Sequence, residues 1–291
     1  MRYLLVSLIL VTANFLHAES PELLSKLEEA GFSPRANNEG ELTAIYGFNP
    51  DGSLSPELWA VIQSSPELIT INSSKMDGED LRETARIQSL ETLVIGGGGE
   101  AEESDYATLA ALPNLKRLNL HHLKNFEGAK AFSNFEDAEK LEHLTIHNCR
   151  PFRGSALPEI AEIPNLKEIE FTALLIDMED LAPLEGHPAL ESLILPVKPA
   201  NMDAFLELAT SLPQLKEISF LCPRGDFTRL DEPQFASLNA IPNLHRIRGI
   251  NLGLTASQVE ALVKEHPGME IELRVKKESH GKSEPMEPLK E

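Results

Sequence analysis

The stretch Leu112-Pro113-Asn114-Leu115-Lys116-Arg117-Leu118-Asn119-Leu120 is the template for most of this 291-residue chain. Its apolar residues Leu115, Leu118 and Leu120 are spaced by three and then by two positions. Repetition at a period of about 25 residues is typical of a solenoid, so the sequence predicts a chain of stacked units. The same phrase returns as Ile163–Leu166 with Ile169 and Phe171, as Leu212–Leu215 with Ile218 and Phe220, and as Ile241–Leu244 with Ile247.

Each unit is predicted to contain one short strand and one helix. The first leucines of successive phrases lie 22 to 29 residues apart, and Ser55-Pro56 and the capping box Thr255-Ala256-Ser257-Gln258 mark helix starts between them. Ordering one unit costs about 1–2 kcal/mol per residue in backbone entropy, more than its few apolar side chains offset, so units fold only when stacked. These leucines are Leu42, Leu68, Leu90, Leu115, Leu141, Leu166, Leu190, Leu215 and Leu244, with a weaker tenth unit at Met269.

This pattern resembles the leucine-rich repeat family, in the helix-containing, ribonuclease-inhibitor-like form found in exported bacterial proteins. The resemblance covers about Leu42 to Leu273. It implies an α/β fold, a leucine-rich repeat solenoid (horseshoe) with a parallel concave sheet and convex helices. The family usually places Asn or Cys eight residues after the first leucine, where the side chain bonds the backbone of the turn. Only Cys149 fits that position here, so the turns are expected to satisfy their backbone groups in another way.

Four segments are predicted along the chain. Residues 1–18 have the features of a secretory signal peptide, and an uncleaved membrane anchor is the alternative. Residues 19–41 contain an N-terminal capping helix, and residues 42–275 form a leucine-rich repeat domain of nine to ten repeats. Residues 276–291 are polar and expected to be disordered. We therefore expect a protein exported to the periplasm, the cell surface or the medium, without a stable membrane span after cleavage.

The net charge limits which partners the protein is expected to bind, and the cysteine spacing bears on disulfides. The chain has 26 Lys and Arg against 46 Asp and Glu, a net charge of -20, which repels nucleic acid and anionic lipid headgroups. Cys149 and Cys222 fall three units apart, beyond the reach of a disulfide, and are expected to pack as small apolar residues. No cofactor motif is recognised. A protein partner is expected and a glycan is the other candidate.

Side chains alternate across a strand, so residues two, four and six positions after each first leucine are predicted to share the concave face. Equivalent positions on neighbouring strands lie about 4.8 Å apart and form rows. Toward the C-terminal end, Arg246 and Arg248 lie beside an apolar strip of Pro196, Leu221 and Ile250, which suits contact with another protein. The middle of the grid is a polar patch of Arg117, Asn119, His121, His143, Thr145, His147, Glu168 and Glu170.

The leading hypothesis is a non-enzymatic binding scaffold that engages its partner through the concave sheet. The first alternative is a metal-dependent or hydrolytic site around His121, His147 and Glu170, because histidines on adjacent strands can share a metal. A structural envelope or surface protein is the second alternative, and an ordinary solvated sheet face is the plainest interpretation of the patch. His187 and His266, each followed by a proline, are predicted to cap helix C-termini as cations.

Overall fold

The computed structural model describes residues 21–49, 54–97, 100–174, 176–222, 228–276 and 283–290. Within these ranges twelve strands form one sheet, in which the pairs from β2 to β13 are parallel and the pairs at both ends are antiparallel. Their order in the sheet is their order in the chain. The strands are β1 (Ser33–Ala36), β2 (Leu42–Phe48), β3 (Thr70–Ser73), β4 (Thr92–Gly96), β5 (Arg117–His121), β6 (His143–His147), β7 (Glu168–Thr172), β8 (Ser192–Leu195), β9 (Glu217–Leu221), β11 (Arg246–Ile250), β13 (Glu270–Val275) and β14 (Glu284–Pro285). A small second sheet pairs β10 (Thr228–Arg229) with β12 (Leu252–Gly253).

Helical segments connect most of these strands. Within the described ranges, five of these segments are 3₁₀ helices. The 3₁₀ segment Met178–Leu184 contains Pro183, which has no N–H to donate and disfavours a regular α-helix. The α-helices described are α1 (Pro21–Glu29), α2 (Pro56–Ser64), α3 (Gly78–Thr84), α4 (Glu103–Tyr106), α5 (Leu157–Ala161), α6 (Met202–Ser211), α7 (Glu232–Asn239) and α8 (Ala256–Glu265).

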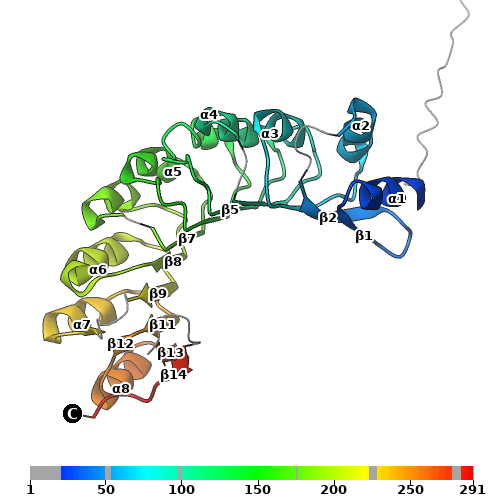
Figure 1. Cartoon of the computed structure of the whole chain (residues 1–291). Coiled ribbons are helices and arrows are strands. Elements are labelled where there is room, and N and C mark those ends of the chain that lie inside the picture. Colours follow the sequence, from blue (N-terminus) through cyan, green and yellow to red (C-terminus); the bar gives the residue numbers. More distant parts are fainter. Residues whose placement is uncertain are drawn as a thin grey trace, which may run out of the picture.

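The strands line the inner side of an arc and the helices lie on its outer side, from α1 at one end to α8 at the other (Figure 1). The layer between them is a continuous apolar core. Leu118 and Leu120 of β5, with Leu144 and Ile146 of β6, are at most 1% exposed. The predicted α/β class and the long parallel sheet are confirmed.

The register of the sheet places equivalent residues of each strand side by side. Arg117 pairs with His143, and His143 pairs with Glu168. Along β5 and β7 buried residues alternate with partly exposed ones. The rows predicted from the sequence therefore exist on the inner face, because alternation of side chains fixes which residues point away from the helices.

Among the described residues, four strands of the sheet are followed directly by a non-glycine residue with positive φ. His122, Asn148, Ala173 and Asn251 have φ between 50° and 59° and directly follow β5, β6, β7 and β11. In each of the turns at His122, Asn148 and Asn251, the N–H donates to a carbonyl of the next strand at 2.8–2.9 Å. This bond satisfies the turn backbone that the family's asparagine would otherwise serve.

Asparagine side chains join neighbouring segments at the opposite end of the strands. Each lies immediately before the first leucine of a phrase and donates to a backbone carbonyl of the preceding segment. Such a bond satisfies a carbonyl that has no partner of its own. The pairs are Asn114 to Gln88 at 2.7 Å, Asn165 to Glu139 at 2.7 Å and Asn243 to Pro213 at 2.9 Å.

His187 serves the same joining purpose, and the prediction that it caps a helix as a cation is wrong. Its Nε2 donates to the Ile163 carbonyl at 3.1 Å, and its Nδ1 accepts the Ala189 N–H at 3.3 Å. An imidazole with these partners is neutral, and burial lowers the pKa of His187 although the bond to Ile163 opposes the shift. His266 also reaches a preceding segment, with its Nε2 3.0 Å from the Asn239 carbonyl.

The two ends of the sheet differ in how well the sequence predicted them. The expected N-terminal helix is present as α1, and its Leu27 is fully buried, but the antiparallel strand β1 was not predicted. The disorder predicted for residues 276–291 is wrong for residues 283–290. There β14 pairs with β13, and the Leu289 N–H donates to the Leu254 carbonyl at 2.8 Å.

Two further predictions concern the N-terminal signal peptide and the two cysteines. The proposed signal peptide at residues 1–18 lies outside the described residues. In the ranges that are described, no helix has both the length and the apolar character to cross a bilayer. Cys149 and Cys222 are both buried, as expected, and no disulfide joins them.

Candidate functional site

The sheet brings the eight residues of the predicted polar patch together on β5, β6 and β7. Arg117, Asn119 and His121 pair with His143, Thr145 and His147. The register continues to β7, where Glu168 and Glu170 lie beside His143 and Thr145. We call these eight residues the central patch: Arg117, Asn119, His121, His143, Thr145, His147, Glu168 and Glu170.

The charges of the central patch are only loosely paired. His143 Nδ1 lies 3.6 Å from Glu168 Oε1, beyond hydrogen-bond distance, and His143 Nε2 lies 4.0 Å from Glu142 Oε2. Across the ranges that the structure describes, Arg117 has no ion pair with any carboxylate within 4.0 Å. A guanidinium on β5 and two glutamates on β7, on either side of β6, therefore do not neutralise one another.

Three of the seven buried side-chain polar atoms that have no hydrogen-bond partner in the described part of the chain lie in or beside the same patch. These three atoms are Asn119 Oδ1, His143 Nδ1 and Ser192 Oγ. They come from β5, β6 and β8, and all three occupy inward-facing rows of the sheet. A buried polar atom without a partner costs about 1–3 kcal/mol, and native proteins contain few of them. The inner face thus offers hydrogen-bonding capacity that the fold itself does not use.

Glu170 contributes a perturbed carboxyl group to this surface. Burial raises its pKa above the ordinary value of 4.5, the neighbouring Glu168 raises it further, and a hydrogen bond from Thr145 opposes the shift. A like charge on the same strand disfavours ionisation of Glu170. A cationic or hydrogen-bond-donating group of a partner would relieve this repulsion.

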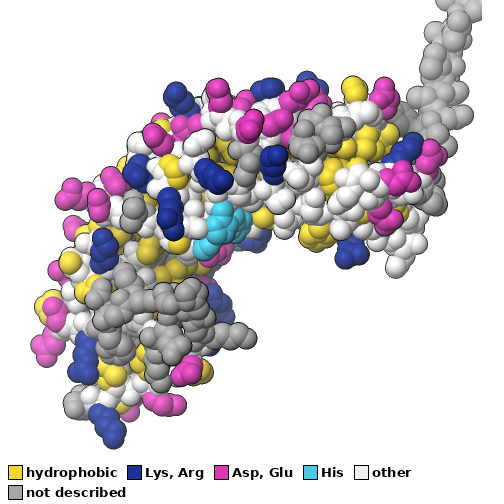
Figure 2. Space-filling view, in the orientation of Figure 1, with side chains coloured by type: hydrophobic (Ala, Val, Ile, Leu, Met, Phe, Trp, Pro, Cys, Tyr) yellow, Lys and Arg dark blue, Asp and Glu magenta, His cyan; other side chains and the backbone are white. Residues whose placement is uncertain are grey.

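Three histidines form a cluster where β5 and β6 end. The ring centroids of His121 and His147 are 5.7 Å apart, and those of His122 and His147 are 5.2 Å apart. Thr172 Oγ1 lies 2.6 Å from His147 Nδ1, and Asn148 Nδ2 lies 2.7 Å from His122 Nδ1. Figure 2 shows histidine side chains together on the inner margin of the arc.

Burial lowers the pKa of His121 and of His147, and the neighbouring histidines lower both further. These two rings are therefore mostly neutral at pH 7. The described residues contain no group of three or more His, Cys, Asp or Glu side chains placed to hold a metal ion. In particular, the structure does not assemble His121, His147 and Glu170 into one metal centre, although the first two rings are neighbours.

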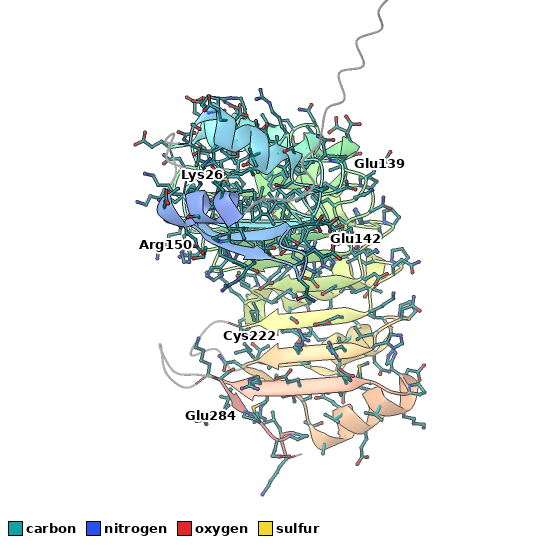
Figure 3. All side chains as sticks on the ribbon, turned by 90° about the vertical axis from the view of Figure 1, so that its right-hand side faces the viewer. Lys26, Glu139, Glu142, Arg150, Cys222 and Glu284 are labelled. Carbon is teal, nitrogen blue, oxygen red and sulfur yellow. The ribbon has the colours of Figure 1, made fainter. Side chains whose placement is uncertain are left out.

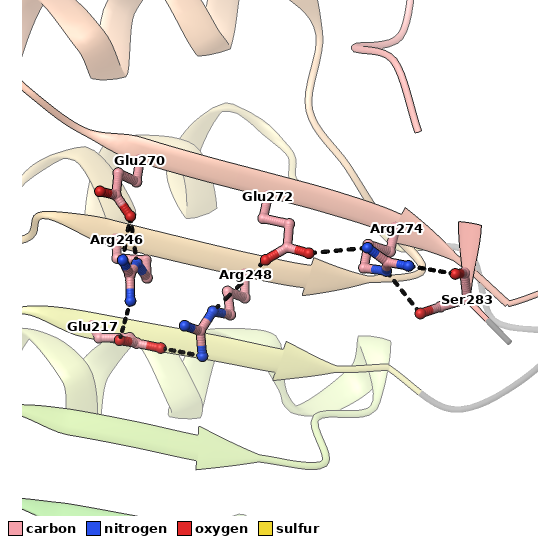
Figure 4. Close-up of polar contacts among 7 residues, drawn as sticks. All are labelled: Glu217, Arg246, Arg248, Glu270, Glu272, Arg274 and Ser283. Atoms are coloured by element: carbon pink, nitrogen blue, oxygen red, sulfur yellow. Dashed lines mark hydrogen bonds and ion pairs between the residues drawn. The ribbon is translucent and has the colours of Figure 1, made fainter. Parts of the chain in front are cut away.

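The C-terminal arginines, in contrast, are enclosed by carboxylates (Figure 4). Glu217 lies 3.5 Å from Arg246 and 2.8 Å from Arg248, so one carboxylate serves two guanidinium groups. Glu270 pairs with Arg246, and Glu272 lies 3.8 Å from Arg248. We call these residues, together with Arg274, which lies 3.1 Å from Glu272, the C-terminal charge network. Arg246 and Arg248 were predicted as contact residues, and the structure shows them already engaged within the sheet.

A row of charged residues at the start of the strands was not predicted from the sequence. It occupies the position immediately after each first leucine and alternates in sign along the sheet. Each lysine pairs with the glutamate of the preceding strand at 2.6–2.9 Å. Figure 3 labels Glu142 of this row at one margin of the sheet and Arg150 at the other. The row is Glu91, Lys116, Glu142, Lys167, Glu191 and Lys216.

No protein-family model matches the chain, and a search of curated proteins finds no relative. The geometry of the inner face is therefore the basis for any functional inference.

Proposed function

We propose that this chain is an exported leucine-rich repeat solenoid that binds a protein partner through the concave side of its sheet. The resemblance noted in the sequence supports the repeat assignment, as does the pairing of strands in chain order with helices outside. Export rests on the leader-like residues 1–18 and implies a location in the periplasm, at the cell surface or in the medium.

The observation that carries the binding proposal is the unused polar capacity of the central patch. Asn119 and His143 each present a buried polar atom without a partner, and Arg117 beside them has no ion pair among the described residues. A partner that contributes a carboxylate to Arg117 and donors to Asn119 and Glu170 would satisfy these groups together. An ordinary solvated face would not need to keep such groups buried.

A protein partner fits this chemistry better than a glycan. The patch contains a guanidinium, two carboxylates and histidines within three strands, a mixture that complements oppositely charged side chains. Beyond Glu170, the row continues to Ile194 on β8, which is partly exposed and extends the surface with an apolar contact. Interfaces between proteins commonly combine an apolar centre with a polar rim.

The test is a crosslinked capture experiment on the mature protein with envelope and secreted fractions of its own source. The native chain is compared with a variant that carries Arg117→Ala, His143→Ala and Glu168→Ala, and circular dichroism verifies that both are folded. We expect a partner that the native protein captures and the variant loses by at least tenfold, equivalent to about 1.4 kcal/mol.

The matched control removes two arginines from the C-terminal charge network, Arg246→Ala and Arg248→Ala. This control should capture the partner as well as the native protein does. Equal capture by the native chain and the central-patch variant, or loss only in the control, would place the binding surface elsewhere and overturn the proposal.

A further inference from the structure

The rim of the sheet beside the histidine cluster carries cations that the central patch does not include. The segments that follow β5 and β6, residues 122–134 and 148–156, contain Lys124, Lys130 and Arg150, all exposed. None of these three forms an ion pair with another described residue within 4.0 Å. Arg153 is also exposed, but it donates to two backbone carbonyls at 2.7–2.8 Å.

These cations are unusual in a chain of net charge -20. Glu127 is the one acidic residue in the two segments. At the strand-start margin, by comparison, Lys116 and Lys167 are each neutralised by a glutamate. Unpaired cations on a strongly acidic protein produce a local positive field that its own carboxylates do not cancel.

The histidines adjoin these cations through the chain. Lys124 lies two residues after His122, and Arg150 lies two residues after Asn148, whose amide contacts His122 at 2.7 Å. Residues on equivalent turns of β5 and β6 lie about 4.8 Å apart. The histidine cluster and the two nearest cations thus occupy one short stretch of the rim.

Acidic residues limit this stretch on both sides. The segment after β4 contains the exposed Glu100 and Glu102, and the segment after β7 contains the exposed Asp177 and Glu179. The positive stretch therefore spans only two strands, about 10 Å. A long polyanion that ran along the rim would meet negative charge at either end, whereas a short anionic group would not.

We propose that this rim, formed by Lys124, Arg150 and the cluster of His121, His122 and His147, binds a short acidic peptide segment of a partner protein. The ammonium and guanidinium groups donate charge-assisted hydrogen bonds to the carboxylates. The histidines supply further donors once protonated. This site shares His121 and His147 with the central patch, but its cations and His122 lie outside the patch, and it does not depend on the proposed function.

The proposed interaction strengthens as pH falls. Burial and neighbouring histidines hold the pKa of His121 and His147 below 6.5, so both rings are largely neutral at pH 7.5 and gain charge only as the pH falls further. The titratable groups that act on these rings are the other histidines of the cluster, and the segments that follow β5 and β6 add Lys124, Glu127 and Arg150 among their charged residues. Glutamates in a bound peptide stay ionised at pH 5.5, because their ordinary pKa is about 4.3.

The experiment measures fluorescence anisotropy of a labelled peptide with four consecutive glutamates between Gly-Ser flanks. A peptide of the same length with glutamines is the ligand control. We expect saturable binding to the full chain at pH 5.5, binding at least threefold weaker at pH 7.5, and no binding of the glutamine peptide. The pH ratio should shrink in His147→Gln.

The protein variant is Lys124→Ala with Arg150→Ala, and the matched control is Arg229→Ala with Lys264→Ala, which removes the same charge from exposed positions elsewhere. The first should weaken binding at least tenfold and the second should not. The variant Arg117→Ala, His143→Ala, Glu168→Ala should bind the peptide normally, because it changes only central-patch residues that the rim site does not include. Absence of binding at both pH values, or equal binding by the two cation variants, would overturn the proposal. Tighter binding of a long polyglutamate than of the short peptide would overturn the two-strand footprint.

Discussion

The central patch and the C-terminal charge network occupy equivalent rows of one sheet, yet they treat their charges in opposite ways. In the network, Glu217 lies between Arg246 and Arg248, and each arginine has a second glutamate. In the central patch, Arg117 has no ion pair within 4.0 Å in the described part of the chain. His143 Nδ1 lies 3.6 Å from Glu168 Oε1, beyond hydrogen-bond distance.

This difference indicates that rows of the same geometry have two roles, one that stabilises the stack of strands and one that leaves polar groups available to a partner. Where the rows carry complementary charges on adjacent strands, they stabilise the stack and leave little for a ligand. Where they carry a mixture whose atoms fall just out of reach, buried groups such as Asn119 Oδ1 are left unsatisfied. Such groups lower stability unless something else bonds them, and binding a partner is one way to do so.

The largest effect on stability is expected from Glu217→Ala. This change leaves two guanidinium groups without their shared carboxylate, and we expect the free energy of unfolding to fall by about 1–2 kcal/mol. The matched change is Glu168→Ala, because Glu168 occupies the same row of the sheet in the central patch. This change should lower the free energy of unfolding by less than about 0.5 kcal/mol, because the contact with His143 is long. Urea denaturation of both variants gives the comparison, and equal losses would contradict the distinction between the two regions.

Glu170→Gln should change stability in the opposite direction. The folded pKa of Glu170 is raised, so the folded protein holds this proton more tightly than the unfolded chain does. The stabilisation that the protonated Glu170 carboxyl gives the folded protein is therefore fully present below pH 4.5, and it is lost as pH rises through the folded pKa.

At pH 7.5 the amide should stabilise the protein by less than about 1 kcal/mol, since water screens a half-buried carboxylate. The gain should vanish below pH 4.5, the ordinary value. Thermal unfolding at several pH values measures the difference between variant and native protein. A destabilised variant at pH 7.5 would show that Glu170 is satisfied within the fold.

Ser192→Ala tests the orphaned hydroxyl directly. Ser192 Oγ is buried without a partner, so its removal should be neutral or stabilise by about 0.5 kcal/mol. Ser219 on β9 is also buried and is not among the unsatisfied groups, which makes Ser219→Ala the matched control. Chemical denaturation of both variants provides the values. A loss of 1 kcal/mol in Ser192→Ala alone would mean that the hydroxyl is bonded in solution.

The smallest expected effect is that of salt. At 1 M ionic strength the Debye screening length is about 3 Å, so salt weakens the attraction within exposed ion pairs. The stability difference between native protein and Glu217→Ala should therefore shrink by a few tenths of a kcal/mol when NaCl is raised from 0.1 to 1 M. The difference for Ser192→Ala should stay constant, because it involves no net charge. Denaturation curves at both salt concentrations decide the matter.

Much of the sheet was predictable because its register follows from spacing alone. Leu115, Leu118 and Leu120 define which side chains face the core, and repetition of that phrase places Arg117 beside His143 without further information. The pairing of the central-patch residues on β5, β6 and β7 therefore follows from the sequence, whereas their role in binding stays a prediction.

Side-chain pairing could not be predicted in the same way. The sequence places Arg246 and Arg248 on the inner face, but whether they meet Glu217 depends on rotamers that spacing does not fix. His122 was missed because it lies one residue past the strand, where a positive φ of 58° turns it toward the neighbouring histidines. The tail was called disordered from composition, whereas pairing of β14 with β13 supplies its backbone partners.

The most direct test of the central claim is carboxyl footprinting of the protein alone and in complex with its captured partner. A carbodiimide and an amine label accessible carboxylates, and mass spectrometry measures the labelling of each glutamate. Labelling of Glu168 and Glu170 should fall at least threefold in the complex, while Glu270 and Glu272 are labelled as before. Protection of Glu270 and Glu272 with unchanged labelling of Glu168 and Glu170 would contradict it.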